Sequence, residues 1–586
     1  MNIRFRLLDP LIAIFIFAIC LLLYNATLTP SLSYASPDGN ELTTVAAILG
    51  LAHPPGYPLL TWLGFLFSRL IPVGDAAHRT NLVSAFLGAG GVALLFLIAR
   101  RVELPRAFAA SHLSNLGFAP AFTLYVLLTD WRILKRPLTL IAAFIAFVLG
   151  AAQFAWIPLR AATITEPLLM RFPPNTLAGF YVYTLGAFTN LRFAFPLAAM
   201  PERIVIYVGY AVANLTPIGF VIGVLGAWAL LFRHPKRFWL LIGMWLTNVW
   251  FFTQYKVFDL DVFFIPAHFV FAIFVGVGAH QLSDWLRAIL ARWRFPARAI
   301  SFAATIAFVI FLAVPLASLA AINFRENNRA TDTAIPDFYQ HVYAILPRDS
   351  ALVGRRAVFG FDMFYWQAVY RVRPDVTLPM PRNIPIPNRD APIFTTVRVE
   401  NGQPQGGIWS PPRDLLPTDA WYIPVLIGSA RDLVLFRASA TPPPLMIADA
   451  QPQSRANHDF GGLMLLGYDV REVESRPLSE IGFPKINPSS RVQIKTYWQM
   501  TQPRAYLIST RVDDRTLETH DLGFGNLARY AREARTSREN IIVEEFDLVI
   551  PSHLKRGAHP LKIGVTEFAD KGITVEWVDA GTINVK

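Results

Sequence analysis

The sequence has little charge and almost no cysteine. Of its 586 residues, 16% are charged, 54% are hydrophobic, and the mean hydropathy is +0.39. A soluble globular chain carries about 25% charged residues, so this deficit excludes an ordinary soluble protein and indicates a lipid environment. The single cysteine, Cys20, lies in an apolar run, which excludes an intrachain disulfide and a cysteine-based metal cluster. Any exported part must therefore be held together by packing alone.

The charge that is present is unevenly placed. A net charge of +12 and a pI of about 9.8 would suggest a nucleic-acid partner in a soluble chain. Here the basic residues gather in short loops beside apolar runs, at residues 100–101, 132–136, 233–237 and 287–298. Cytoplasmic loops of membrane proteins show this bias. The sequence therefore predicts a multi-pass plasma-membrane protein without a nucleic-acid partner.

Seven apolar segments approach or exceed the roughly 20 residues that a bilayer span requires. They are residues 11–26, 81–99, 138–157, 204–232, 238–252, 262–280 and 300–322. Two more are ambiguous, since 56–71 is short and broken by Pro58, and 108–128 contains His112, Asn115 and Pro120. We therefore expect an α-helical membrane domain over residues 1–322 with about seven to nine spans. A signal peptide cleaved near Ala35 is an alternative for the first segment.

The basic loops set the expected orientation. With Arg4 and Arg6 inside, the basic loops after residue 128 fall in the cytoplasm whether seven or nine segments cross. The region after Ile322 then lies outside. Two long segments, 27–80 and 160–203, also lie outside, and we expect them to roof a cavity, because polar backbone near the bilayer must be covered by protein or water.

The remaining chain has the composition of soluble domains. Residues 323–440 combine a helical pattern with short strands and Pro-rich loops, which predicts a small α/β region. A Pro-rich linker at 441–445 precedes alternating runs over 446–586, which predict an extracytoplasmic β-sandwich. Tyr497, Trp498 and Trp577 are candidates for stacking on sugar, although aromatics in a sandwich also serve as core. We expect an accessory role for this part.

The first outer loop holds the densest group of candidate functional residues. Asp38 and Glu41 stand three residues apart at the start of a helical pattern, so they can share one face and act as a general base or a cation site. Alternatively, Asp38 is a helix N-cap and Glu41 its capping-box partner. A rigid polar turn follows, made of His53, Pro54, Pro55, Gly56, Tyr57 and Pro58.

These motifs resemble a known family. The D-x-x-E pair, the short helix, the HPPGYP turn and the RTNLVSA run at 79–85 are similar to the first module of GT-C membrane glycosyltransferases. The nearest group is the family labelled domain of unknown function 2723, related to protein O-mannosyltransferases. IPLRA at 157–161 and the run at 255–278 extend the resemblance over residues 11–322. It implies that 56–71 is a juxtamembrane helix, which favours seven spans. The family usually has further helices where this chain has only residues 102–110.

The resemblance implies transfer of a sugar from a polyprenyl-phosphate donor to an acceptor hydroxyl on a protein or glycan, at the outer face and with inversion. Asp38 would be the general base, and Glu41 would orient the acceptor or assist. The expected partners of the donor phosphate are Arg160 and Lys256, followed by Arg79 and His53. Each of these cations has the alternative role of anchoring to lipid headgroups.

No cofactor is firmly implied. Asp259 and Asp261 lie in a short loop where two acids can bind a divalent cation, but solvation of the loop explains them equally well, and no metal site is assigned. Two other functions remain open. A transporter or flippase of lipid-linked saccharides would be expected to contain a repeated half, and none is evident. A catalytically inactive, glycan-binding scaffold would fit the shortened stretch at 102–110.

Overall fold

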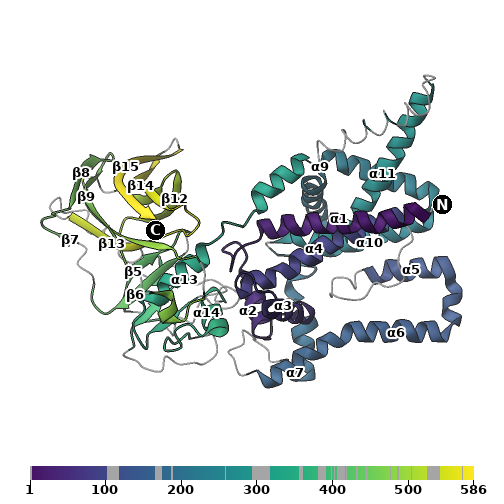
Figure 1. Ribbon diagram of the computed structural model, residues 1–586, viewed down its shortest axis with the longest axis horizontal. Coiled ribbons are helices and arrows are strands. Elements are labelled where there is room, and N and C mark those ends of the chain that lie inside the picture. The colour runs from purple at the N-terminus through teal and green to yellow at the C-terminus, as the bar shows by residue number, and fades with distance from the viewer. Residues whose placement is uncertain are drawn as a thin grey trace.

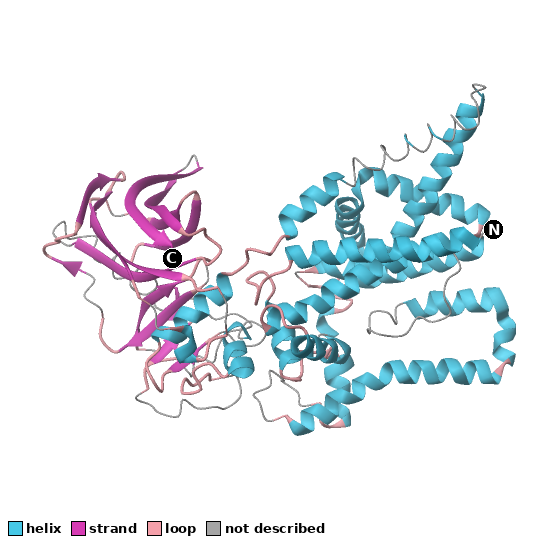
Figure 2. Ribbon diagram, viewed as in Figure 1, coloured by secondary structure: helices cyan, strands magenta, loops and turns pink. Residues whose placement is uncertain are grey.

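The computed structural model describes residues 3–101, 118–164, 174–186, 189–257, 259–292, 302, 306, 317–354, 361–379, 391–397, 399–400, 403–404, 416–417, 419–430, 433–442, 446–474, 477–484, 487–502, 504–523, 541–569 and 572–585. Helices gather at one end of the molecule and strands at the other (Figures 1 and 2). The described α-helices of the first end are α1 (Ile3–Thr27), α2 (Pro37–Ala47), α3 (Pro58–Leu70), α4 (Ala76–Arg101), α5 (Ala119–Asp130), α6 (Pro137–Ala151), α7 (Trp156–Thr163), α8 (Leu177–Tyr181), α9 (Met200–Arg233), α10 (Pro235–Thr253) and α11 (Ile265–Arg292).

Five helical segments in the described part are long and apolar enough to cross a membrane. They are Leu8–Thr27, Ala76–Leu97, Pro137–Thr163, Leu197–Arg233 and Leu260–Arg292, and they correspond to five of the seven predicted spans. The predicted span at 238–252 forms the 19-residue helix α10, which is not among these five. Most of the predicted span at 300–322, and the first half of the ambiguous segment at 108–128, lie outside the described residues. A total of seven to nine spans stays a prediction.

Helix packing in the membrane part depends on small residues and one kink. Gly226 of α9 faces Gly278 of α11, and a Cβ on Gly226 would lie 1.8 Å from the carbonyl oxygen of Phe274. Only glycine permits this approach, a common device between membrane helices. Helix α9 kinks at Thr216, directly before Pro217, which cannot donate a helical hydrogen bond. Helix α6 buries no side chain against the described remainder.

The segment at 27–80, predicted as an outer loop, contains two short helices. Helix α3 is 13 residues long, too short to span a bilayer and consistent with a juxtamembrane helix. Helices α2 and α3 lie between the membrane helices and the strand-rich end (Figure 1). Apolar side chains of α2, among them Val45 and Ala47, join those of α13 (Ala334–Ile345) and α14 (Phe361–Tyr370) in one hydrophobic core. The outer loop is therefore packed against the region that follows the membrane domain.

Hydrogen bonds reinforce this junction at the start of α4. The hydroxyl of Tyr370 accepts from the backbone N–H of Ala76 at 2.8 Å, and that of Tyr365 accepts from Ala77 at 2.9 Å. The Tyr365 hydroxyl also donates to the buried Asp75 carboxylate at 3.0 Å. The first N–H groups of a helix have no partner within the helix, so α14 satisfies two of them for α4.

The strands form two main sheets. The larger has nine strands, in the order β1-β2-β6-β5-β13-β10-β9-β8 with β7 beside β13. The smaller has the order β12-β11-β14-β15, and side chains of both sheets share a core. The bounds are β1 (Ala351–Val353), β2 (Ile393–Thr395), β5 (Trp421–Ile427), β6 (Val434–Ser439), β7 (Met446–Ile447), β8 (Ser454–Asp459), β9 (Leu463–Glu472), β10 (Ser490–Met500), β11 (Leu507–Val512), β12 (Arg515–Asp521), β13 (Ile541–Ile550), β14 (Gly557–Ala569) and β15 (Gly572–Val585), with a separate pair of β3 (Val399–Glu400) and β4 (Gln403–Pro404).

The larger sheet crosses the boundary predicted at residues 440–446. Strand β5 pairs in parallel with β13, through Leu426 with Asp547 and Ile427 with Leu548. The α/β region and the C-terminal part are therefore joined by backbone pairing. The structure describes this end as a mixed α and β assembly, and a β-sandwich in the strict sense stays a prediction.

Candidate functional site

Helix α2 begins at Ser36. The Ser36 hydroxyl oxygen accepts a hydrogen bond from the Gly39 N–H at 3.2 Å, and Pro37 occupies the first helical position. Asp38 therefore lies in the first turn and is exposed. The capping-box interpretation of Asp38 and Glu41 is wrong, because the residue three positions after the actual cap is Gly39. Both carboxylates are left available for other roles.

Glu41 fixes the turn that follows α2. Its side chain is completely buried, and it accepts a hydrogen bond of 2.5 Å from the His53 backbone N–H. Its second oxygen lies 2.6 Å from Nδ1 of the same histidine. Burial disfavours the charged imidazole, but the hydrogen bond and charge of Glu41, with the charges of Asp38 and Asp259, raise the pKa of His53 overall. Glu41, which is buried, and His53, which is partly buried, thus form a hydrogen-bonded pair.

The HPPGYP turn is held closely against helix α7. Its Pro54–Pro55 peptide is cis, and Gly56 has a φ of +104°. A Cβ on Gly56 would lie 2.7 Å from Cδ1 of Ile157, so glycine is required both by the backbone conformation and by this contact. The rings of His53 and Tyr57 meet edge to face with centroids 5.3 Å apart. The turn thereby presents an imidazole and a phenol beside α2.

A third carboxylate joins Asp38 and Glu41. Asp259 lies between α10 and the 3₁₀ helix Leu260–Phe264 and is half-buried. Burial raises its pKa, the charge of Asp38 raises it further, and His53 lowers it. For Asp38, burial by surrounding protein raises the pKa despite its exposed tip, His53 opposes this shift, and Glu41 adds to it. We call Asp38, Glu41, Asp259 and His53 the carboxylate cluster.

Two tyrosines and one further cation border this cluster. Burial raises the pKa of Tyr57, and the charges of Asp38 and Glu41 act in the same direction. Burial also raises the pKa of Tyr255, whereas Arg192 lowers it. Sequence analysis missed Arg192, which follows the short 3₁₀ helix Thr189–Leu191 in a loop without a recognisable motif. Among the described residues, no three His, Cys, Asp or Glu side chains are arranged to hold a metal ion.

The predicted phosphate partners fall in different places. His53 belongs to the carboxylate cluster, and Lys256 is exposed in the loop that carries Asp259. The guanidinium of Arg79 donates to the backbone carbonyls of Ser68 and Val73, at 3.1 and 3.3 Å. Arg79 therefore closes the turn between α3 and α4.

Arg160 lies at the other end of α2. Its Nε donates to the carbonyl of Leu49 at 2.6 Å, just beyond the last residue of α2, Ala47. Nine residues separate Asp38 from Ala47, a distance of about 14 Å along a helix. Arg160 shares a cavity there with Arg69 and Arg371. The structure thus groups Arg160 with two other arginines.

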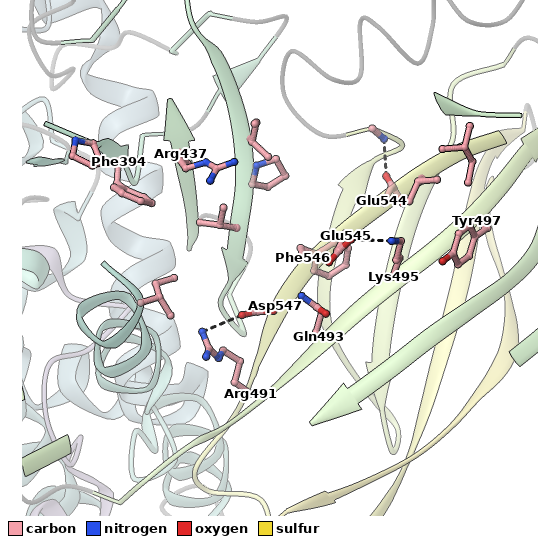
Figure 3. Close-up of a pocket in the computed structure, with 18 of the residues that line it drawn as sticks. Phe394, Arg437, Arg491, Gln493, Lys495, Tyr497, Glu544, Glu545, Phe546 and Asp547 are labelled. Atoms are coloured by element: carbon pink, nitrogen blue, oxygen red, sulfur yellow. Dashed lines mark hydrogen bonds and ion pairs between the residues drawn. The ribbon is translucent and has the colours of Figure 1, made fainter. Parts of the chain in front are cut away.

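The strand-rich end contains a larger groove, of about 980 Å³ (Figure 3). Strand β10 contributes alternate side chains, and its charges are paired across to β13: Arg491 with Asp547 at 3.0 Å and Lys495 with Glu545 at 3.2 Å. Of the predicted sugar-stacking aromatics, Tyr497 lines this groove, whereas Trp498 is fully buried in the core and the ring of Trp577 lies under the guanidinium of Arg511, 5.2 Å away.

Part of this site is similar in sequence to known proteins. The family profile described as "Protein O-mannosyl-transferase TMEM260 N-terminal domain" matches residues 38–115. Protein O-mannosyl-transferase TMEM260 of Mus musculus is 36% identical over 124 residues, which are 21% of this chain and 17% of the relative. The Dictyostelium discoideum protein of the same name is 38% identical over 86 residues, 14% of this chain and 10% of the relative.

The matched stretches thus cover less than a fifth of either relative, and no solved structure matches the chain. The family match begins at Asp38 and includes Glu41, the HPPGYP turn and Arg79. The part of this chain that carries Asp38, Glu41, His53 and the HPPGYP turn is therefore similar to the N-terminal domain of protein O-mannosyl-transferases, whereas Asp259 lies outside the matched residues.

Proposed function

We propose that this protein is a membrane glycosyltransferase that moves a sugar from a polyprenyl-phosphate donor to an acceptor hydroxyl, with inversion. The observation that carries the proposal is an exposed carboxylate, Asp38, beside the hydrogen-bonded pair of buried Glu41 and partly buried His53. This arrangement lies within the stretch similar to protein O-mannosyl-transferases. The names of the relatives favour mannose as the sugar and a protein as the acceptor.

The residues of the cluster suit distinct roles in such a reaction. The carboxylate of Asp38 takes the proton of the acceptor hydroxyl, whose oxygen attacks the anomeric carbon opposite the phosphate. The bond from that carbon to the phosphate oxygen breaks, and the polyprenyl phosphate leaves with the electron pair. Because burial raises the pKa of Asp38, this carboxylate is a stronger base than a solvated aspartate. Glu41 acts as a positioning residue through His53.

Cations must stabilise the departing phosphate. His53, whose pKa is raised by Glu41, and Lys256, exposed in the loop of Asp259, are our candidates nearest to Asp38. Arg160 and Arg79 are candidates for lipid phosphate at greater distance, since both hold backbone carbonyls of the outer loop. Charge-assisted bonds to phosphate are about twice as strong as neutral ones.

The proposal includes a topology. Seven to nine spans place the carboxylate cluster and everything after residue 322 on the extracytoplasmic side of the plasma membrane, opposite the basic residues 233–237. The hydrogen bonds between α14 and the start of α4 support this arrangement, because two segments in direct contact outside the bilayer must lie on the same side of the membrane. The C-terminal β-sandwich, with its charge-paired groove, would position the acceptor or stabilise the fold.

The substitution Asp38→Asn tests the proposal. It keeps the shape of the side chain but removes its basicity, so transfer from a polyprenyl-phosphate sugar should fall by about 100- to 10,000-fold, as is typical for loss of a general base. Asp284→Asn is the matched control, because Asp284 is a partly exposed acid on α11 that pairs with Arg287. Both purified variants should melt at the wild-type temperature and bind donor lipid.

Near-normal transfer by the Asp38→Asn protein would reject the catalytic assignment. Movement of the lipid-linked sugar between vesicle leaflets, with no glycosylated acceptor formed by the wild type, would instead favour the transporter hypothesis.

A further inference from the structure

A cavity of about 380 Å³ lies at the C-terminal end of helix α2. Three arginines from distant parts of the chain line it: Arg69 in the last turn of α3, Arg160 in α7 and Arg371 directly after α14. Figure 1 shows these helices close to α2, where the membrane helices meet the strand-rich end. We call this cavity the arginine pocket.

The arginine pocket concentrates positive charge. Among the described residues, no carboxylate lines it and none of the three guanidinium groups forms an ion pair. Like charges held close together repel each other. An anion in the pocket would turn this repulsion into attraction, and the planar guanidinium matches phosphate oxygens in a two-bond geometry.

Each arginine is oriented by its own surroundings. Arg160 is fixed by its bond to the Leu49 carbonyl and lies 3.3 Å from the Thr163 hydroxyl. The guanidinium of Arg69 lies over the ring of Phe65, 5.2 Å from its centroid. Arg371 has a φ of +60°, a conformation that is uncommon outside glycine and that turns the chain sharply at the end of α14.

The position of the pocket indicates where the anion comes from. Helix α3 leaves Leu70 69% exposed, and Leu159, next to Arg160, is 66% exposed. The rings of Trp62 in α3 and Trp156 in α7 meet edge to face, and tryptophan is enriched at membrane–water interfaces. Exposed leucines beside a basic pocket match a lipid, whose chains cover the apolar surface while its phosphate lies at the interface.

We infer that the arginine pocket binds the phosphate group of a membrane lipid and thereby links the membrane helices to the soluble region. Arg69 and Arg160 contact the phosphate from the membrane part, and Arg371 contacts it from the soluble part. The chemistry is that of a phosphate ester, supplied either by a diacyl phospholipid or by a polyprenyl phosphate. The inference rests on charge and position, so it does not depend on sugar transfer.

Matched lipid pairs test the inference by native mass spectrometry of the purified full-length chain. Phosphatidic acid and diacylglycerol differ only by the phosphate, as do a polyprenyl phosphate and the corresponding polyprenol. We expect at least one phosphate-bearing lipid to bind about tenfold more tightly than its partner, because charge-assisted bonds are lost with the phosphate. The pair that shows the preference identifies the source.

The variants Arg69→Gln and Arg371→Gln should each reduce that preference several-fold. Neither should lower the melting temperature of lipid-free protein, because each removes one of three repelling charges. Arg348→Gln, at an exposed position away from the pocket, is the control and should bind like the wild type. Equal binding of both members of both pairs, or unchanged binding by the two pocket variants, would overturn the inference. Asp38→Asn should retain the binding, so failure of the proposed transfer is measured separately.

Discussion

The two ends of helix α2 have opposite electrostatic character. At the N-terminal end, carboxylates dominate, with one histidine among them: Asp38, Glu41, Asp259 and His53. At the C-terminal end, the side chains are cationic: Arg69, Arg160 and Arg371. Acids near a helix N-terminus and cations near its C-terminus are both favoured by the helix dipole. Along the helix, Asp38 is therefore about 14 Å from Ala47, which lines the basic pocket.

This separation has a chemical consequence. A guanidinium next to a carboxylate favours the ionised form and lowers its pKa, which would weaken Asp38 as a base. Among the main influences on Asp38, only His53 lowers the pKa, while burial and Glu41 raise it. Keeping the arginines at the far end of the helix thus preserves basicity where a proton would be taken. Four substitutions test this comparison, in order of decreasing effect.

Glu41→Gln should have the largest effect. It leaves the His53 imidazolium without its buried partner, and breaking a buried ion pair typically costs about 3–5 kcal/mol of folding free energy. The pKa of His53 is raised in the folded protein. The stabilisation that the pair gives the folded state is therefore fully present below the pKa of His53 in the unfolded chain, and it is lost as pH rises through the raised pKa of the folded protein.

Chemical unfolding of wild type and Glu41→Gln across this pH range measures the effect. The two stabilities should converge at high pH, and a constant difference at all pH values would show that Glu41 acts through packing alone. Asp38→Asn is the control, because its side chain is exposed and should change stability little.

Tyr365→Phe should weaken the junction that holds the arginine pocket together. The change removes the hydroxyl that accepts from the buried N–H of Ala77 and donates to a carboxylate oxygen of Asp75. The loss of such buried hydrogen bonds lowers the free energy of unfolding by about 1–3 kcal/mol. A lower melting temperature with unchanged acidic pH dependence of transfer is expected. The control is Tyr468→Phe, which removes an exposed hydroxyl bond of 3.2 Å and should be neutral. Equal loss in both variants would contradict a special role for the junction.

Arg160→Gln should affect donor binding more than turnover. Removing one charge-assisted contact to a lipid phosphate weakens binding by about tenfold, so KM for the donor should rise while kcat is nearly kept. Steady-state kinetics at several donor concentrations separates the two constants. A fall in kcat together with a shifted pH profile would mean that Arg160 acts next to Asp38, and the separation along α2 would then be rejected.

His53→Asn should lower the rate of transfer, since it removes a candidate phosphate cation, and the smallest of the four tested differences is the accompanying shift in the pH dependence. Asp38 must be ionised to act as a base, so transfer falls as pH decreases through its raised pKa. His53 lowers that pKa, and its loss should therefore move the acidic limb of kcat/KM to higher pH. A pH–rate profile measures this shift. The control is Asp261→Asn, which changes an exposed acid and should leave the limb in place. A limb that moves to lower pH would contradict the assignment of Asp38.

Several features of the site were predictable from local patterns. The D-x-x-E pair and the HPPGYP turn are contiguous in sequence, and the structure brings Glu41 and His53 together across only 12 positions. The five long apolar helices follow from hydrophobicity, because length and composition suffice to identify such segments. Serine before proline at residues 36–37 was also a visible helix-start signal, although Asp38 was considered as the cap instead.

Other features depend on contacts between distant segments. The charge of Asp38 raises the pKa of Asp259, 221 positions away in sequence, and Arg69 and Arg371 come from two different parts of the molecule. Likewise, β5 pairs with β13 although a proline-rich stretch that was predicted to be a domain linker lies between them in the sequence. Hydrophobic periodicity identifies elements but does not state which of them become neighbours.

The sequence by itself determined a part with several helices long and apolar enough to cross a membrane, a less hydrophobic C-terminal part, and an acidic motif shortly after the first apolar segment. These properties depend on composition and on residues a few positions apart, where bond geometry leaves little choice. Tertiary structure decided that Glu41 is buried against His53, that Asp38 stays exposed, and that three arginines meet at the far end of α2. Burial and charge proximity set the protonation state of each group, and both arise only when segments distant in sequence pack together.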